Sequence, residues 1–94
     1  MHWGQLHERH EKLLAEHHSL DSLAFLLMHG REIEFSAKNQ SCFLSRHGSA
    51  QTVSLWINQQ EQSFSSETEL FTNAQILGKP FLQMWEKAQI ETIL

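Results

Sequence analysis

Apolar and polar residues alternate along the middle of the chain, and polar turns separate the alternating runs. A period of two is typical of strands that bury one face and leave the other in water. The first run shows this cleanly, because Ile33 and Phe35 share one face while Glu32 and Glu34 share the other. We therefore predict an antiparallel meander of strands: Arg31–Ala37, Ser41–His47, Gln51–Asn58 and Glu61–Phe64.

The two faces of this predicted sheet differ in chemistry. Val53, Leu55 and Ile57 continue the apolar row begun by Ile33 and Phe35. A row of this kind is the usual inward face of a sheet, because it must be buried against another layer. We expect the second of the N-terminal helices and the C-terminal helix to cover it.

The opposite face is predicted to carry Glu32, Glu34, Phe43 and Trp56. Two aromatic side chains rimmed by carboxylates are either covered by a helix or exposed as a binding patch. We favour coverage by a helix, with an exposed interface for a partner or a second copy as the alternative.

Two helices are predicted before the sheet. Apolar residues recur at three- and four-residue steps in Gln5–His18, which is typical of an amphipathic helix. Leu20–Met28 is apolar nearly all round, as buried helices are. Ser19 is a suitable N-cap for it, and Gly30 is a conventional stop.

The chain after the meander is predicted to be mainly helical. Ser66 and Glu69 fit a capping box at the start of a short helix that runs to about Ala74. Pro80–Ala88 forms a second amphipathic segment, with the proline in the first turn. The tail, Gln89–Leu94, is either a closing strand or frayed helix.

These elements predict an α+β fold in a single domain over the 94 residues. It has N-terminal helices, an antiparallel β-meander of three to four strands, and C-terminal helices packed on one face of the sheet.

Two segments resemble a known family. One is Arg31–Phe35 directly after an apolar helix, and the other is Gly78–Leu82 followed by Trp85. Over about Leu23–Ile93 the chain resembles small bacterial proteins of unknown function with a helix, a Glu-rich first strand, a meander and a C-terminal helix. Pro80 departs from the small polar residue expected there. The resemblance implies a fold but no activity, ligand or catalytic residue.

Charge excludes some classes of function. Seven Lys and Arg against eleven Asp and Glu give a net charge of −4, which is the wrong sign for binding phosphate backbones. We expect no nucleic-acid partner. The longest apolar run is too short to span a membrane, so no membrane association is expected. The single cysteine and the absence of a secretory signal favour the cytoplasm.

Histidine is the unusual ionisable residue, with seven copies. His7, His10 and Glu11 lie at i, i+3 and i+4 of the first predicted helix, close enough for a surface metal site. A solvated helix rich in histidine is the interpretation we favour. His10 and His17 fall in the apolar stripe, where burial of neutral imidazoles would make the helix sensitive to acid. Satisfied boundary histidines are the commoner case.

Catalytic constellations are sparse. The Glu32 and Glu34 carboxylates are about 6.5 to 7 Å apart along one strand face, but paired acids there commonly serve solubility. Cys42 and His47 differ by an odd number of positions, so they should point to opposite faces. No phosphate-binding loop or zinc-protease motif occurs. We expect no catalytic residue and no cofactor.

The sequence therefore predicts a non-catalytic protein–protein interaction or regulatory module, binding a protein partner or a second copy. Its binding surface would comprise Glu32, Glu34, Phe43 and Trp56. The alternative is a metal- or pH-responsive protein that uses the histidine-rich first helix.

Overall fold

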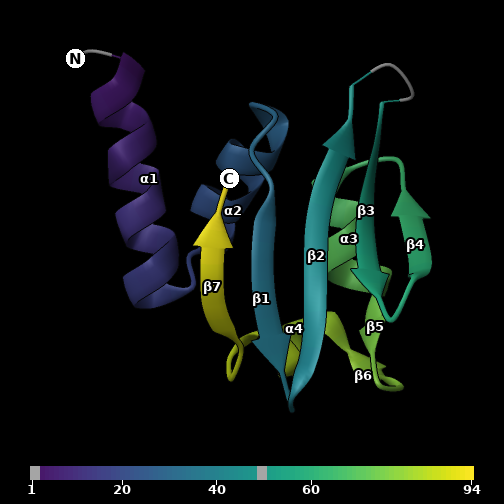
Figure 1. The fold of residues 1–94 in the computed structure, drawn as a ribbon. Coiled ribbons are helices and arrows are strands. Elements are labelled where there is room, and N and C mark those ends of the chain that lie inside the picture. Colours follow the sequence, from purple (N-terminus) through teal and green to yellow (C-terminus); the bar gives the residue numbers. More distant parts are fainter. Residues whose placement is uncertain (1–2, 49–50) are drawn as a thin grey trace.

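A computed structural model describes residues 3–48 and 51–94 and has helices packed against an antiparallel sheet (Figure 1). The helices are α1 Trp3–His17, α2 Leu20–Met28, α3 Glu67–Asn73 and α4 Phe81–Trp85. The strands are β1 Ile33–Ala37, β2 Gln40–His47, β3 Thr52–Ile57, β4 Gln60–Phe64, β5 Gln75–Ile76, β6 Lys79–Pro80 and β7 Gln89–Ile93.

The main sheet has five strands in the order β4-β3-β2-β1-β7. Strands β1 to β4 form the predicted meander, with ends within two residues of the predicted bounds. The tail is a strand, the first of the two alternatives, and β7 pairs antiparallel with β1. The predicted α+β class is confirmed, and β7 makes the sheet one strand wider than expected.

Two-residue turns fix the register of the meander. Lys38–Asn39 joins β1 to β2, and Asn58–Gln59 joins β3 to β4. All four residues have positive φ, between 48° and 68°, as type I′ turns require. The backbone twist of such turns matches that of the flanking strands, so each hairpin closes without splaying.

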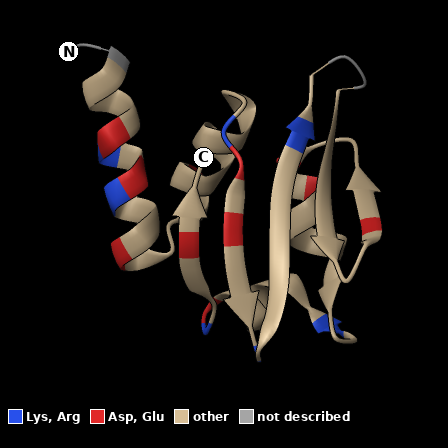
Figure 2. Ribbon diagram, in the orientation of Figure 1, with Lys and Arg blue, Asp and Glu red and all other residues tan. Residues whose placement is uncertain are grey.

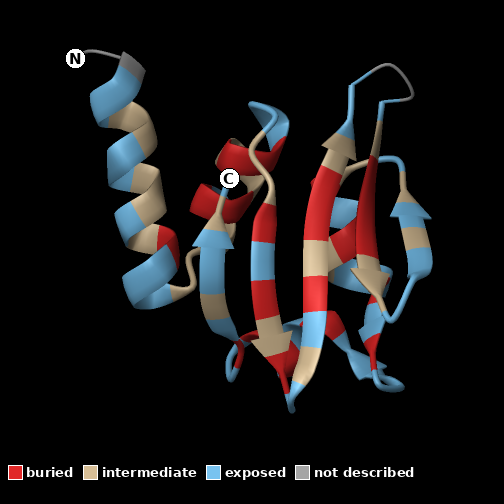
Figure 3. Ribbon diagram, viewed as in Figure 1, coloured by how far each residue is buried: buried red, intermediate tan, exposed pale blue. Residues whose placement is uncertain are grey.

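One face of the sheet is covered by α2, α3 and α4, which lie behind the strands in Figure 1. Ile33, Phe35, Leu44, Val53 and Leu55 point into this layer and are at most 1% exposed. Figure 3 shows the resulting alternation of buried and exposed residues along β1. The predicted apolar row is therefore the inward face.

Aromatic rings form the centre of the core. The ring of Phe35 lies edge-on to that of Trp85, with centroids 5.1 Å apart. Phe81 stacks on Trp85 at 5.5 Å and on Phe71 at 5.8 Å. The indole N–H of Trp85 donates to the carbonyl of His18 at 3.0 Å. These contacts join β1, α3, α4 and the α1–α2 connection in one cluster.

Helix α1 does not lie over the sheet. It packs against α2 and beside β7 (Figure 1), and Leu14 is its fully buried residue. His17 was predicted to lie in the apolar stripe, but its side chain is 69% exposed. Because α1 lies at the border of the sheet and not over it, only a narrow stripe of α1 contacts its neighbours. His17 lies outside this stripe.

The two predicted helix caps form. Ser19 Oγ accepts from the Ser22 N–H at 3.2 Å, and Ser66 Oγ accepts from the Glu69 N–H at 3.1 Å. The reciprocal half of the capping box differs, because the Glu69 carboxylate accepts a hydrogen bond from the Ser65 hydroxyl. Glu69 thus holds the residue before the cap.

The predicted C-terminal helix is shorter than Pro80–Ala88. Helix α4 ends at Trp85, where the N–H groups of Lys87 and Ala88 donate to the carbonyls of Met84 and Trp85 in tight turns before the chain enters β7. Pro80 lies in β6, which forms a small hairpin with β5 around Leu77–Gly78. The Gln62 side chain ties this hairpin to β4, since its amide donates to the Gln75 carbonyl and accepts from the Gln75 N–H.

Within residues 3–48 and 51–94, no helix combines the length and hydropathy that crossing a membrane requires.

We predict that Phe35→Ala lowers the free energy of unfolding by about 3 to 5 kcal/mol, because it leaves a cavity between β1 and the Phe81 and Trp85 rings. Urea denaturation at 25 °C measures this. Leu82→Ala is the matched control, since Leu82 is 42% exposed and its loss should cost less than about 1 kcal/mol. Equal effects of the two substitutions would contradict the described core.

Candidate functional site

A row of four side chains crosses the face of the sheet that the helices leave open. Glu34 pairs with Phe43, Phe43 with Trp56, and Trp56 with Glu61 on four successive strands. Cross-strand partners on one face are close neighbours, so the two aromatic residues lie between two carboxylates. We call these residues the cross-strand row.

No helix in the described part of the chain covers this face. Figure 1 views the sheet from this side, with α2, α3 and α4 behind it and α1 beside β7. The prediction that a helix covers Trp56 is therefore wrong. Helices α2, α3 and α4 pack against the buried apolar row on the other face of the sheet. Helix α1 contacts α2 and β7 and does not cover Trp56.

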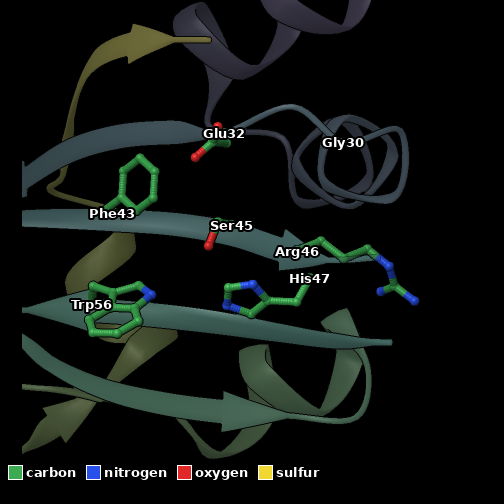
Figure 4. Close-up of a pocket in the computed structure, with 7 residues that line it drawn as sticks. All are labelled: Gly30, Glu32, Phe43, Ser45, Arg46, His47 and Trp56. Carbon is green, nitrogen blue, oxygen red and sulfur yellow. The ribbon is translucent and has the colours of Figure 1, made fainter. Parts of the chain in front are cut away.

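A hollow of about 520 Å³ lies on this uncovered face, at the end of the sheet where β2 ends (Figure 4). It is lined by Gly30, Glu32, Phe43, Ser45, Arg46, His47 and Trp56. Three of the four residues predicted for a binding surface, Glu32, Phe43 and Trp56, thus meet around one hollow. Glu34 belongs to the adjacent cross-strand row.

The sequence pattern did not single out Ser45 and His47 for this site. Ser45 and His47 follow Phe43 at steps of two residues along β2. This spacing alone could have placed all three side chains on the same face of the sheet. Arg46 belongs to the opposite face, where its guanidinium donates to the Glu67 carboxylate of α3 at 2.5 Å. Figure 4 shows the Arg46 side chain directed away from Phe43 and Trp56. Arg46 therefore fastens α3 to the sheet.

A polar cluster lies beside Trp56. The hydroxyls of Ser54 and Ser63 donate to the same oxygen of Glu61, at 2.5 and 3.0 Å. His47 Nε2 is 3.6 Å from that oxygen. Hydrogen bonds from Ser54 and Ser63, and to a lesser extent the nearby His47, hold the pKa of the Glu61 carboxyl below its usual range. Glu61 thus keeps a negative charge at this end of the row.

The order of groups in this cluster differs from a nucleophile relay. In a serine–histidine–acid triad the imidazole lies between the hydroxyl and the carboxylate. Here the Glu61 carboxylate lies between Ser54 and His47, and the Ser54 side chain is fully buried. The hydroxyls of this cluster stabilise the negative charge of Glu61.

Cys42 and His47 lie on opposite faces of β2, as their spacing predicts. Cys42 is 3% exposed on the helix-covered side, whereas His47 lines the hollow. Burial raises the pKa of the Cys42 thiol to about 11, so the thiol is protonated at neutral pH.

Glu34 of β1 and Glu32, which directly precedes this strand, lie on the uncovered face. In the part of the chain that the structure describes, the side chains of Glu32 and Glu34 form no hydrogen bond or ion pair. The Glu32 backbone is fixed, because its carbonyl accepts from the Leu94 N–H at 2.7 Å. The backbone of Glu32 is therefore held in place, and the residue is partly exposed.

The residues predicted to bind a metal contact other groups instead. His10 Nδ1 hydrogen-bonds to the Ser22 hydroxyl at 2.9 Å, while Arg31 donates to His7 Nδ1 and to the Glu11 carboxylate, both at 3.1 Å. Among residues 3–48 and 51–94, no group of three or more His, Cys, Asp and Glu side chains is placed to hold a metal ion. The structure therefore does not form the predicted group.

Arg31 contacts two elements that are distant in the sequence. Its guanidinium reaches Glu11 of α1 and also donates through Nε to the Leu94 carbonyl at 2.6 Å. Arg31 thus connects the first helix to the end of β7.

Comparison with protein-family models, curated proteins and solved structures finds no match for the chain. The resemblance to small bacterial proteins stays a prediction.

We predict that Ser54→Ala raises the pKa of Glu61 toward its ordinary 4.5, because one of its two hydroxyl donors is lost. A carboxyl carbon NMR titration measures this. Since the folded pKa is the lower one, the ionised Glu61 stabilises the fold above pH 4.5, and this contribution disappears as the pH falls through the folded pKa.

The matched control for this titration is Ser36→Ala. Ser36 lies on the same face of the sheet as Glu61, but on β1, whereas Glu61 lies on β4. It should leave the Glu61 titration unchanged. An identical Glu61 pKa in the wild type and in Ser54→Ala would contradict the role given to the hydroxyl.

Proposed function

We propose that the protein is a non-catalytic binding module that receives a protein partner on the uncovered face of its sheet. The observation that carries this proposal is the pair Phe43 and Trp56, half-buried on a face that no described helix covers and beside a hollow of about 520 Å³. Aromatic side chains in such positions are the usual anchors of protein interfaces.

The surroundings of the pair suit an interface. Glu34 and Glu61 flank it in the cross-strand row, and Glu32 borders the hollow. An apolar centre with a charged rim is the common anatomy of a protein-binding patch. The strands beneath are held by tight turns and a buried core, so the patch is presented on a rigid support.

A different protein is a better occupant than a second copy. In a face-to-face pair, Glu32, Glu34 and Glu61 of each copy would approach the same acidic groups of the other, and the chain carries a net charge of −4. Like charges at an interface cost affinity. We place this function in the cytoplasm, which the single free cysteine supports.

One observation favours a second candidate function, an acid response of α1. Three imidazoles surround Phe25: the ring centroids of His7, His10 and His29 lie 5.4, 4.0 and 4.2 Å from it. Arg31 adds a fixed positive charge to this group. We propose that protonation of these histidines weakens the contact between α1 and α2.

The geometry gives a reason for the direction of this response. His7 Nδ1 accepts a hydrogen bond from Arg31, and a proton on that nitrogen would remove the acceptor and place a cation against the guanidinium. Glu11 is the carboxylate that faces Arg31 in this cluster, so it offsets part of the added charge. Acid should therefore loosen α1 before it unfolds the sheet.

We predict that Trp56→Ala abolishes binding of the cognate protein, because the central aromatic anchor is removed. The experiment is affinity capture from native cells with wild-type protein, followed by calorimetry of the purified pair. Loss of a central anchor commonly weakens a complex by more than about 2 kcal/mol. Light scattering of the protein alone reports any self-association.

Leu82→Ala is the matched control for this binding experiment, since Leu82 is an exposed apolar residue on α4, at the other side of the sheet. It should bind like the wild type. Thermal unfolding of both variants checks that the fold is intact. A partner that binds wild type, Trp56→Ala and Leu82→Ala equally would disprove the proposed surface.

We predict that lowering the pH from about 7.5 to about 5.5 lowers the amide protection factors of α1, which are corrected for the slower intrinsic exchange in acid, but leaves those of β1 to β3 unchanged. The double variant His7→Gln with His10→Gln should lose this dependence. His17→Gln is the control, because that side chain is exposed, and it should respond like the wild type. Simultaneous loss of protection in α1 and the sheet would exclude the second candidate.

A further inference from the structure

We infer that the hollow receives an arginine side chain of the protein partner, whose guanidinium stacks on Trp56 and Phe43 and bonds to the acids around them. This inference rests on the proposed binding function and names the chemistry that the uncovered face recognises.

The charges on this face favour a cationic ligand. Figure 2 shows acidic residues on β1, β4 and β7 of the sheet, while Arg46 lies at the end of β2 that borders the hollow. Arg46 is engaged by Glu67 and directed away from the aromatic residues. On the described part of this face, Glu32 and Glu34 have no ion-pair partner. The hollow therefore has one carboxylate without an ion-pair partner, Glu32, while Arg46 in its lining is already paired with Glu67 and His47 lies 3.6 Å from Glu61.

The position of the aromatic rings also favours a cation. Phe43 and Trp56 are cross-strand neighbours, and both line the hollow together with Glu32 (Figure 4). A cation over the face of an indole or phenyl ring is attracted by the electrons of that ring. A cation bound here would touch aromatic surface and carboxylates at the same time.

The shape of the cation distinguishes arginine from lysine. A guanidinium is planar, so it stacks on a ring while its N–H groups donate in the plane to carboxylates. An ammonium group is a compact, strongly hydrated charge and stacks poorly. The row of ring, ring and carboxylate from Phe43 to Glu61 suits the planar group better.

The Glu61 carboxylate adds a negative charge at neutral pH. Ser54 and Ser63 donate to it, which favours its ionised form, and its position opposite Trp56 places it at the edge of the aromatic pair. Because Glu34 lies at the other edge, an arginine side chain can be flanked by acids whichever way it enters.

The test uses three capped pentapeptides of alternating glycine with two arginines, two lysines or two citrullines, added to the full protein and followed by NMR. The arginine peptide should shift the Trp56 indole N–H and the Phe43 ring signals most. The lysine peptide should bind several-fold more weakly. Citrulline, which has the shape of arginine but no charge, should bind weakest of the three.

Matched variants locate the binding. Glu32→Gln with Glu34→Gln, and separately Trp56→Ala, should each weaken binding of the arginine peptide about tenfold. Glu8→Gln with Glu16→Gln removes the same charge from exposed positions of α1 and should leave the affinity within about twofold of wild type. Equal affinity for the arginine and citrulline peptides would overturn the inference, as would an unchanged affinity in the Glu32 and Glu34 double variant.

The outcomes separate this inference from the proposed function. If a cognate protein requires Trp56 but the peptides are not discriminated, the binding module stands and the arginine assignment is wrong. If the arginine peptide binds as expected but no protein depends on Trp56, the hollow recognises the guanidinium of another ligand and a protein partner is wrong. If neither result appears, both proposals fail.

Discussion

Strand β1 buries Ile33 and Phe35 between the sheet and the helices, and this burial fixes the direction of its other side chains. A strand alternates with a period of two, so the same packing forces Glu32 and Glu34 to the opposite face. A slip of one residue would bury two carboxylates and expose Phe35, which would cost far more than any gain in pairing. The uncovered acidic face is thus a consequence of the core.

Much of the fold follows from the sequence because alternation, caps and tight turns are local signals. The faces of the meander, the Ser19 and Ser66 caps and the end of α2 all depend on neighbours within a few positions. The cover of the sheet is different, because an amphipathic pattern reports that a helix has a buried side but not which surface buries it. For the same reason the position of α1 beside β7 was not predicted. The predicted C-terminal helix, Pro80–Ala88, is longer than the observed α4.

In the candidate site too, local spacing predicts some residues, whereas others depend on strand register and tertiary contacts. Parity on a strand was enough to bring Glu32, Phe43 and Trp56 to one face. The cluster of Ser54, Glu61 and Ser63 could be predicted only if the register between β3 and β4 were known. This register is set by the Asn58–Gln59 turn. Helical spacing likewise placed His7 near Glu11, but it could not show that Arg31, distant in sequence, would lie between them.

The two neighbours of β1 are reached at very different distances along the chain. Strand β2 follows after the Lys38–Asn39 turn, whereas β7 returns only after the rest of the meander, α3 and α4. Closing a short loop costs little chain entropy, and closing a long one is slow because few local contacts precede it. We therefore expect the meander to assemble first and β7 to dock late, with one edge of β1 open in the interval. An unpaired edge of this kind is where a growing sheet is most exposed to pairing with a neighbouring chain.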